Sequence, residues 1–172
     1  MHEGSEQYRF LERDLASVDR ARTPWVIFMG HRPIYSCWGR DSDIGAVEDL
    51  LMMYRVDLSL WGHVHNAQVT CPVYRSRCVE KGADGYDAPI HAVIGNAGQE
   101  ITFEKLIPTI ENYTEFYAME YGFSTLVVDG GRTLTMNYYG DLNSNGTQIA
   151  GGGFELHYTF TIDKTARGAQ RR

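Results

Sequence analysis

The chain has 172 residues and a formal net charge of −6. A chain of this length can form one domain that buries roughly 70% of its unfolded surface. The acidic balance and the lack of a sustained basic stripe argue against a nucleic-acid-binding surface. No apolar run approaches the ~20 residues that span a bilayer, and the polar start shows no signal-peptide pattern.

The first predicted element is a helix near the N-terminus. Tyr8, Leu11, Leu15 and Val18 form an apolar stripe at helical spacing. Ser5 stands where an N-cap is needed, and its hydroxyl can accept a hydrogen bond from the first turn.

The next elements are two apolar runs that each end in a Gly-His pair. They cover Pro24–His31 and Val56–His63, and the second continues through Val64 to His65. The segment between them predicts a helix with Asp43 as its N-cap, because apolar residues recur there at helical spacing: Ile44, Val47, Leu50, Leu51 and Tyr54. Strand, helix and strand in this order predict a βαβ unit with parallel strands.

Both Gly-His corners then lie at the same edge of the predicted sheet, where α/β proteins bind ligands. Neutral imidazole is a common ligand of transition metals, so we predict that His31, His63 and His65 share a metal site. A glycine before each histidine allows a sharp turn and close approach to a ligand. If the backbone stays extended, His63 and His65 project to the same side. The alternative is that each histidine is a structural polar group at a strand end.

The cysteines and two asparagines bear on the compartment. Cys71 and Cys78 flank a short loop that a disulfide could close, which leaves Cys37 free or paired with a group outside the chain. Asn112 and Asn145 begin glycosylation acceptor patterns. We therefore expect a secreted, vacuolar or lysosome-like protein.

The second half of the chain predicts a further buried strand and then antiparallel strands. The buried strand covers Pro89–Ile94. Gly122–Val128 and Arg132–Tyr139 flank Asp129-Gly130-Gly131, a hairpin signal, and Phe154–Ile162 alternates between apolar and polar residues. The predicted fold class is α/β (α+β), a βαβ unit followed by antiparallel strands.

Two histidines in this half are expected to serve the fold rather than a metal. His91 lies inside the buried strand and is predicted to be a hydrogen-bonded core residue. His157 lies on the polar face of the last strand and is predicted to be solvated.

An ordered series of motifs in this chain resembles the purple acid phosphatases, within the calcineurin-like metallophosphoesterases. The series covers nearly the whole chain: Gly30-His31-Arg32-Pro33-Ile34-Tyr35, Gly62-His63-Val64-His65-Asn66, Thr70-Cys71-Pro72-Val73-Tyr74, Ile94-Gly95-Asn96-Ala97-Gly98 and Tyr121-Gly122-Phe123-Ser124. The resemblance implies the C-terminal half of a four-layer α/β/β/α sandwich.

The resemblance also implies a dinuclear hydrolase of phosphate monoesters, with Fe(III) beside a zinc, manganese or iron divalent ion. The position matching His65 binds the ferric ion in that family, and those matching His31 and His63 bind the divalent ion. Two adjacent cations neutralise phosphate and lower the pKa of bound water. Asn66, next to the last histidine, is expected to support the ligands.

The chain departs from the family in two respects. The remaining ligands of the family lie upstream, including a bridging aspartate and the asparagine of a Gly-Asn-His-Glu motif, and no such motif occurs here. We therefore expect the C-terminal part of a longer enzyme, inactive in isolation, with an unpaired sheet edge. The loop after the first Gly-His also lacks the histidine of plant-type relatives; Arg40 and Asp41 are the candidates to hold phosphate and donate a proton, or else a solvated charge and a turn residue.

The predicted organisation is half of a catalytic domain over residues 1–100, a β-rich region over 101–163 and a disordered tail over 164–172. The expected partner is a phosphate monoester, with neither nucleic acid nor a membrane span, and the intact protein could form a homo-oligomer. Two alternatives stay open: a phosphodiesterase or nucleotide hydrolase of the same superfamily, and a truncated, non-catalytic module that binds a metal or a partner.

Overall fold

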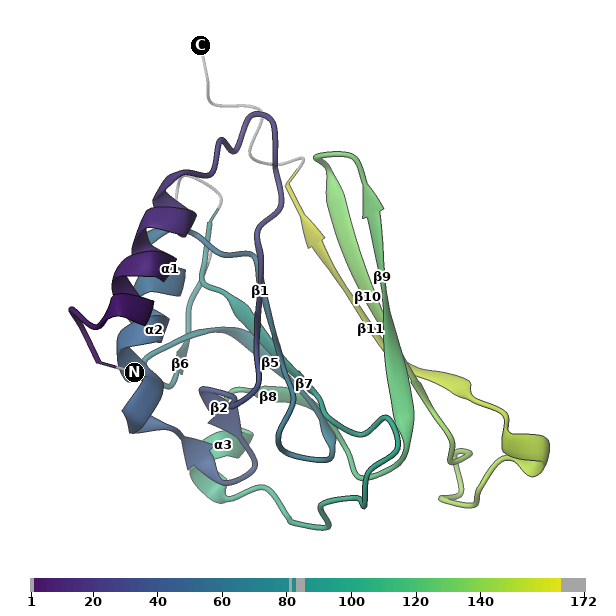
Figure 1. Cartoon of the computed structure of the whole chain (residues 1–172). Coiled ribbons are helices and arrows are strands. Elements are labelled where there is room, and N and C mark those ends of the chain that lie inside the picture. Colours follow the sequence, from purple (N-terminus) through teal and green to yellow (C-terminus); the bar gives the residue numbers. More distant parts are fainter. Residues whose placement is uncertain (1, 81, 83–85, 165–172) are drawn as a thin grey trace.

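The computed structural model describes residues 2–80, 82 and 86–164 (Figure 1). Of the tail predicted over 164–172, Lys164 is among the described residues and 165–172 lie outside them. The helices are short and few: α1 (Glu6–Ala16), α2 (Gly45–Met53) and α3 (Pro108–Glu111), with 3-10 turns at Ser42–Ile44 and Ala150–Gly152. The strands are β1 (Ile27–Gly30), β2 (Tyr35–Ser36), β3 (Gly39–Arg40), β4 (Leu58–Trp61), β5 (Ala67–Tyr74), β6 (Arg77–Cys78), β7 (Ile90–Ile94), β8 (Thr114–Ala118), β9 (Gly122–Asp129), β10 (Thr133–Gly140) and β11 (Glu155–Asp163).

The larger sheet is mixed and has six strands, in the order β1-β4-β7-β5-β6, with β8 paired to β5. β1 and β4 are parallel, with Ile27 opposite Leu58 and Gly30 opposite Trp61. Since α2 connects these two strands, the predicted βαβ unit is confirmed. The two Gly-His corners therefore lie side by side at one edge.

A helical layer covers one face of this sheet. Ser5 caps α1 as predicted, because its hydroxyl accepts a hydrogen bond from Tyr8 N at 3.2 Å. The prediction of Asp43 as the cap of the second helix is wrong. The carboxylate of Asp41 instead accepts from Asp43 N at 2.8 Å and caps the preceding 3-10 turn, and Ile44 at the N-cap of α2 makes no side-chain bond.

The other face of the mixed sheet packs against a three-stranded antiparallel sheet, in the order β11-β10-β9. The predicted hairpin is confirmed, with Thr133 opposite Asp129 across the turn. The core between the sheets consists of buried apolar side chains from both: Leu58, Leu60, Val69, Ala92, Leu134 and Met136. The layers are thus helices, mixed sheet and antiparallel sheet, in the order seen from left to right in Figure 1.

The expectation that His157 is solvated is wrong. Its Nδ1 lies 2.8 Å from Oε1 of Glu120, and the Glu120 side chain is only 5% exposed. Alternation along β11 identifies the polar face, but it cannot show that a buried carboxylate from a distant segment faces that side.

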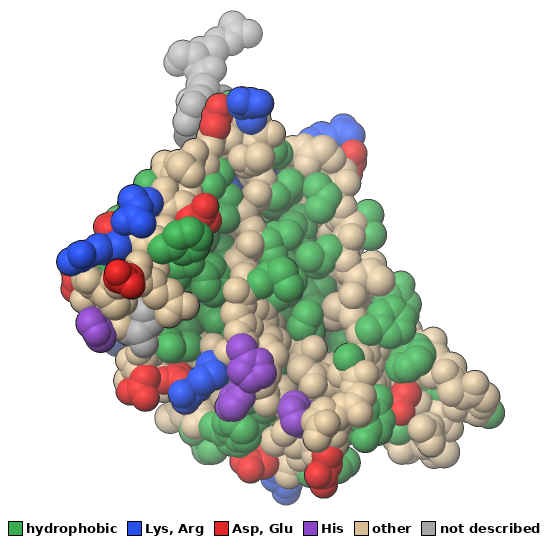
Figure 2. Space-filling view, viewed as in Figure 1, with side chains coloured by type: hydrophobic (Ala, Val, Ile, Leu, Met, Phe, Trp, Pro, Cys, Tyr) green, Lys and Arg blue, Asp and Glu red, His purple; other side chains and the backbone are tan. Residues whose placement is uncertain are grey.

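One edge of the mixed sheet is open in the part of the chain that the structure describes. β1 is the terminal strand of the sheet order, and the side chain of Met29 on it is 73% exposed. Figure 2 shows hydrophobic side chains along this face of the molecule. The expected unpaired edge is therefore present. β8 follows residue 100 in the chain but belongs to the mixed sheet. The predicted division of the chain between residues 100 and 101 remains a prediction.

Candidate functional site

Two histidines face each other at the carboxyl ends of β1 and β4. His31 follows β1, His63 follows β4 after one intervening glycine, and both are exposed. His63 Nδ1 lies 3.1 Å from His31 Nε2, and the rings cross at 75°. The parallel register of β1 and β4 brings them together, because it places the ends of both strands at the same level.

The sequence predicts that the glycine before each histidine makes the turn, but at the second corner the histidine itself makes it. His63 itself has a φ of 67°, whereas Gly62 is not in the left-handed region. The backbone is therefore not extended through His63, and the premise that His63 and His65 project from an extended chain is wrong. A non-glycine residue in this region is uncommon and is often found at functional sites.

Gly30 is needed for a close approach rather than a turn. A Cβ at this position would lie 2.5 Å from the ring of Trp61 on the neighbouring strand. The two corners are then tied by a hydrogen bond from Gly62 N to His31 O at 3.1 Å.

His65 is held separately, by the segment that follows β7. Its Nδ1–H donates to the Glu100 carbonyl at 2.7 Å, because a carbonyl oxygen can only accept. Its backbone N–H donates to Thr102 Oγ1 at 3.1 Å, and Thr102 N–H donates to His65 O at 2.9 Å. This leaves Nε2 as the nitrogen that carries a lone pair, which is the arrangement typical of a metal-ligating histidine.

The donor set fits a metal in part. Among the described residues, no group of three or more His, Cys, Asp or Glu side chains is positioned to hold one ion. His31 and His63 form a pair, and His65 stands apart with an oriented ring. The assignment of all three as ligands remains a prediction, and a shared ion would need donors besides these.

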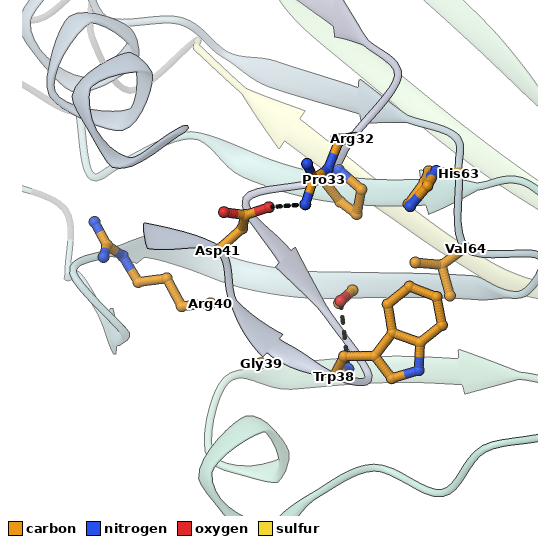
Figure 3. Close-up of a pocket in the computed structure, with 9 residues that line it drawn as sticks. Arg32, Pro33, Trp38, Gly39, Arg40, Asp41, His63 and Val64 are labelled. Atoms are coloured by element: carbon orange, nitrogen blue, oxygen red, sulfur yellow. Dashed lines mark hydrogen bonds and ion pairs between the residues drawn. The ribbon is translucent and has the colours of Figure 1, made fainter. Parts of the chain in front are cut away.

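A pocket of about 230 Å³ opens beside His63 (Figure 3). The segment after β1, the β2–β3 hairpin and the segment after β4 line it: Arg32, Pro33, Ser36, Trp38, Gly39, Arg40, Asp41, His63 and Val64. Arg32 and Asp41 form an ion pair across it at 2.9 Å, with the Arg32 side chain 57% exposed. Asp41 therefore lies in the same pocket as His63, and its role as a proton donor remains a prediction.

Arg40 is not directed at the histidines. Its Nη2 lies 2.5 Å from Oε2 of Glu48, whose side chain is 1% exposed, and Figure 3 shows the guanidinium pointing away from His63. Glu48 also accepts hydrogen bonds from Tyr35 Oη and from Arg75 N. The geometry thus gives Arg40 the structural role of neutralising a buried carboxylate.

Asn66 is fully buried and connects two elements beside the site. Its Nδ2 lies 3.1 Å from Tyr117 Oη on β8 and 3.5 Å from Cys37 Sγ in the β2–β3 turn. The Asn66 side chain therefore links the hairpin to β8, and its support of the metal ligands remains a prediction. Sequence reasoning missed Trp38 and Glu104, which join the same network; an aromatic residue in the loop after the first Gly-His was the only signal available.

Cys71 and Cys78 form a disulfide, with an S–S distance of 2.05 Å and Cα atoms 5.8 Å apart. Cys37 is free and buried, and burial raises the pKa of its thiol. Asn112 and Asn145 are both exposed, as glycan attachment requires. The disulfide is consistent with a protein of the secretory pathway. None of the helices in the described ranges has the length and apolarity needed to cross a membrane.

His91 is a core residue, as the sequence predicts. It is 1% exposed, and Trp61 Nε1–H donates to its Nδ1 at 3.1 Å. Burial lowers the pKa of the imidazole from 6.5 to about 3, so the ring is neutral.

Two family models match the chain. Residues 1–67 match calcineurin-like phosphoesterase, and residues 88–150 match iron/zinc purple acid phosphatase-like protein C. The Arabidopsis thaliana protein named "Probable inactive purple acid phosphatase 27" is 35% identical, over 96% of this chain and 27% of its own length. A Hordeum vulgare protein named "Nucleotide pyrophosphatase/phosphodiesterase" is 34% identical, over 79% of this chain and 40% of its own.

The fold points to the same family. The structure of a purple acid phosphatase, PPD1, from yellow lupin (Lupinus luteus) seeds matches with a TM-score of 0.72 and 31% identity, covering 94% of this chain and 29% of that one. The chain thus spans 27% to 40% of the length of each of these three proteins. From both family models and this shared fold, the chain belongs to the purple acid phosphatase-like, calcineurin-like metallophosphoesterases.

Proposed function

We propose that the whole protein hydrolyses phosphate monoesters at a dinuclear metal centre, to which this chain contributes His31, His63 and His65. The observation that carries the proposal is the approach of His31 Nε2 to His63 Nδ1 at 3.1 Å, at two strand ends that both lie within the residues matching calcineurin-like phosphoesterase, 1–67. The iron/zinc family match implies a dimetal centre in active members.

When bound, a ferric ion and a divalent zinc, manganese or iron ion would neutralise the phosphate and acidify a water molecule. His31 and His63 supply a pair of nitrogen donors for the divalent position. His65 presents Nε2 to the ferric position while Glu100 O holds the opposite nitrogen. Asp41 lies in the same pocket and is the acid candidate, with Arg32 holding its carboxylate in place.

The three layers described here are proposed to be part of a four-layer α/β/β/α sandwich. Residues 1–100 would then belong to the catalytic domain, and 101–163 would form the β-rich region packed on it. The exposed acceptor asparagines and the disulfide support a secreted, vacuolar or lysosome-like location.

The test uses the full-length protein, loaded with iron and zinc, and measures metal content and phosphate release from an aryl phosphate. We expect two metals per protein and turnover in the native protein, and the His63→Ala variant should lose metal and activity together. His2→Ala is the matched control, since His2 is exposed and distant in sequence from the site. A fully loaded, folded protein that releases no phosphate would refute the proposal.

A second candidate is a phosphodiesterase or nucleotide hydrolase, which the name of the Hordeum vulgare relative favours. Comparing turnover of a monoester and a diester with the same aryl group separates the two. A third is a non-catalytic module, favoured by the name of the Arabidopsis thaliana relative. It predicts metal binding, or partner binding, without turnover of either ester.

A further inference from the structure

Trp38 is an exposed aromatic side chain beside the candidate metal ligands. It lies in the turn of the β2–β3 hairpin, where Ser36 pairs with Gly39. The residue is 49% exposed, and the centroid of its ring lies 6.1 Å from that of His63, at 84°. Figure 3 shows the indole at the wall of the pocket, next to Val64 and below His63.

The indole is fixed although it is exposed. Its Nε1–H donates to Glu104 Oε2 at 2.7 Å, and the backbone carbonyl of Glu104 accepts a hydrogen bond from Tyr117 Oη. Tyr117 Oη in turn lies 3.1 Å from Asn66 Nδ2, which also contacts the Cys37 sulfur next to Trp38. One end of this network therefore holds the indole of Trp38, and the other end contacts Cys37, the preceding residue of the same turn.

The size and lining of the pocket restrict what could lie on the indole. Its volume of about 230 Å³ is below the roughly 300–1,000 Å³ of pockets for drug-sized ligands, so it suits a single ring. Pro33 and Val64 give it apolar walls, and Arg32 and Asp41 compensate each other's charge at 2.9 Å. A planar ring would lie against Pro33, Val64 and Trp38, while the polar side chains of the lining suit the rest of the pocket to polar groups.

We propose that Trp38 is a specificity-determining residue that stacks on an aromatic leaving group of the phosphate ester. The inference rests on the proposed function, which places the phosphate at the histidines. The ring of an aryl ester is joined to phosphorus by one oxygen atom, so an ester whose phosphate lies at His63 can carry its ring toward Trp38, whose ring centroid lies 6.1 Å from that of His63. Glu104 acts as a positioning residue, because its carboxylate accepts the hydrogen bond of the indole N–H.

The experiment measures binding of two phosphonates that cannot be hydrolysed, benzylphosphonate and methylphosphonate, to the metal-loaded full-length protein by calorimetry; the CH2 group of benzylphosphonate takes the place of the ester oxygen. The variants are Trp38→Ala, Trp38→Phe and, as a matched control, Phe103→Ala, because Phe103 is 75% exposed and does not line the pocket. We expect Trp38→Ala to weaken binding of benzylphosphonate roughly three- to tenfold, as for the loss of one aromatic pair, and binding of methylphosphonate by less than about twofold. Trp38→Phe should keep most of the affinity for the aromatic phosphonate, and Phe103→Ala should change the affinity for neither phosphonate.

Each outcome decides between explanations. Equal weakening of both phosphonates by Trp38→Ala, or no weakening of either, would overturn the role of Trp38 while leaving the proposed function intact. Failure of the native protein to bind methylphosphonate or inorganic phosphate would overturn the proposed function, and the inference with it. Weakening by Phe103→Ala equal to that by Trp38→Ala would show a general effect of exposed aromatic residues and would also overturn it.

Discussion

The polar side chains at the two ends of the parallel strands β1 and β4 differ in burial and in pairing. At the carboxyl ends, His31 and His63 are exposed and His63 has a positive φ. At the amino end of β4, the Asp57 side chain is fully buried and lies 2.8 Å from Arg20 Nη2 and 2.5 Å from Lys164 Nζ. At the amino end, the charge of the buried carboxylate is compensated by two cations, which keeps this end folded. At the carboxyl end, the histidines remain available to a ligand.

The compensated end also joins distant parts of the chain. Lys164 follows β11, and its ammonium contacts the Pro24 carbonyl and lies 3.7 Å from the centroid of the Trp25 ring. Val26 N donates to Asp57 Oδ2 at 2.9 Å, just before β1 begins. The entry to β1, the entry to β4 and the end of β11 therefore meet at a single carboxylate.

The largest expected effect comes from removing that carboxylate. Asp57→Ala leaves the ammonium of Lys164, which is 8% exposed, without this counter-charge and should destabilise the protein by about 3–5 kcal/mol in urea unfolding. The control is Arg132→Ala, which breaks the exposed pair with Asp129 and should cost under about 1 kcal/mol. Similar losses of stability in the two variants would contradict the claim that the buried pairs of Asp57 contribute more than an exposed ion pair.

A smaller loss of stability is expected from adding a methyl group at Gly95, beside the segment that carries His63 and His65. A Cβ at Gly95 would lie 2.2 Å from the Val64 carbonyl, between His63 and His65, so Gly95→Ala must displace that segment. We expect a loss of about 1–3 kcal/mol, typical of overpacking, and reduced metal content in the full-length protein. Gly62→Ala is the matched control, since the nearest atom there, His31 Nδ1, is 3.6 Å away and the change should be milder. A tolerated Gly95→Ala would show that this segment is mobile.

The pH dependence of the free energy of unfolding should come from His91, which is buried on β7 in the mixed sheet. The pKa of His91 is lowered from 6.5 to about 3 by burial, so the unfolded chain takes up a proton first as the pH falls. The contribution is complete above pH 6.5 and is lost on acidification at about 1.4 kcal/mol per pH unit, levelling off near pH 3. Protonated Nδ1 could no longer accept from Trp61 Nε1–H.

This prediction is checked by urea unfolding across that pH range with His91→Asn, which cannot titrate. The variant should be less stable at neutral pH and should show a flatter pH dependence. An unchanged slope would assign the pH dependence to other groups.

The smallest effect is expected at the His65 clamp. Thr102→Val removes the hydroxyl that accepts from His65 N but keeps the side-chain shape, and should cost about 1 kcal/mol. In the full-length protein we expect lower iron content with the divalent metal retained, because only His65 loses a contact. Equal loss of both metals would contradict the separation of His65 from the His31–His63 pair.

Local patterns in the sequence determined a large part of this fold. Periodicity and capping predicted α1 with Ser5 at its start, the parallel pair β1 and β4, and the β9–β10 hairpin, because each depends on residues close together in the chain. The repeated Gly-His ending also predicted that His31 and His63 would meet, since parallel strands share one edge.

Only the tertiary structure decided which polar groups face one another across long separations. It directed Arg40 to Glu48, placed Glu120 against His157, and buried Asp57 between Arg20 and Lys164. It also fixed Trp38 beside His63 through Glu104. Spacing in a single sequence cannot predict such pairs, because their partners come from different elements and meet only when the sheets and helices pack.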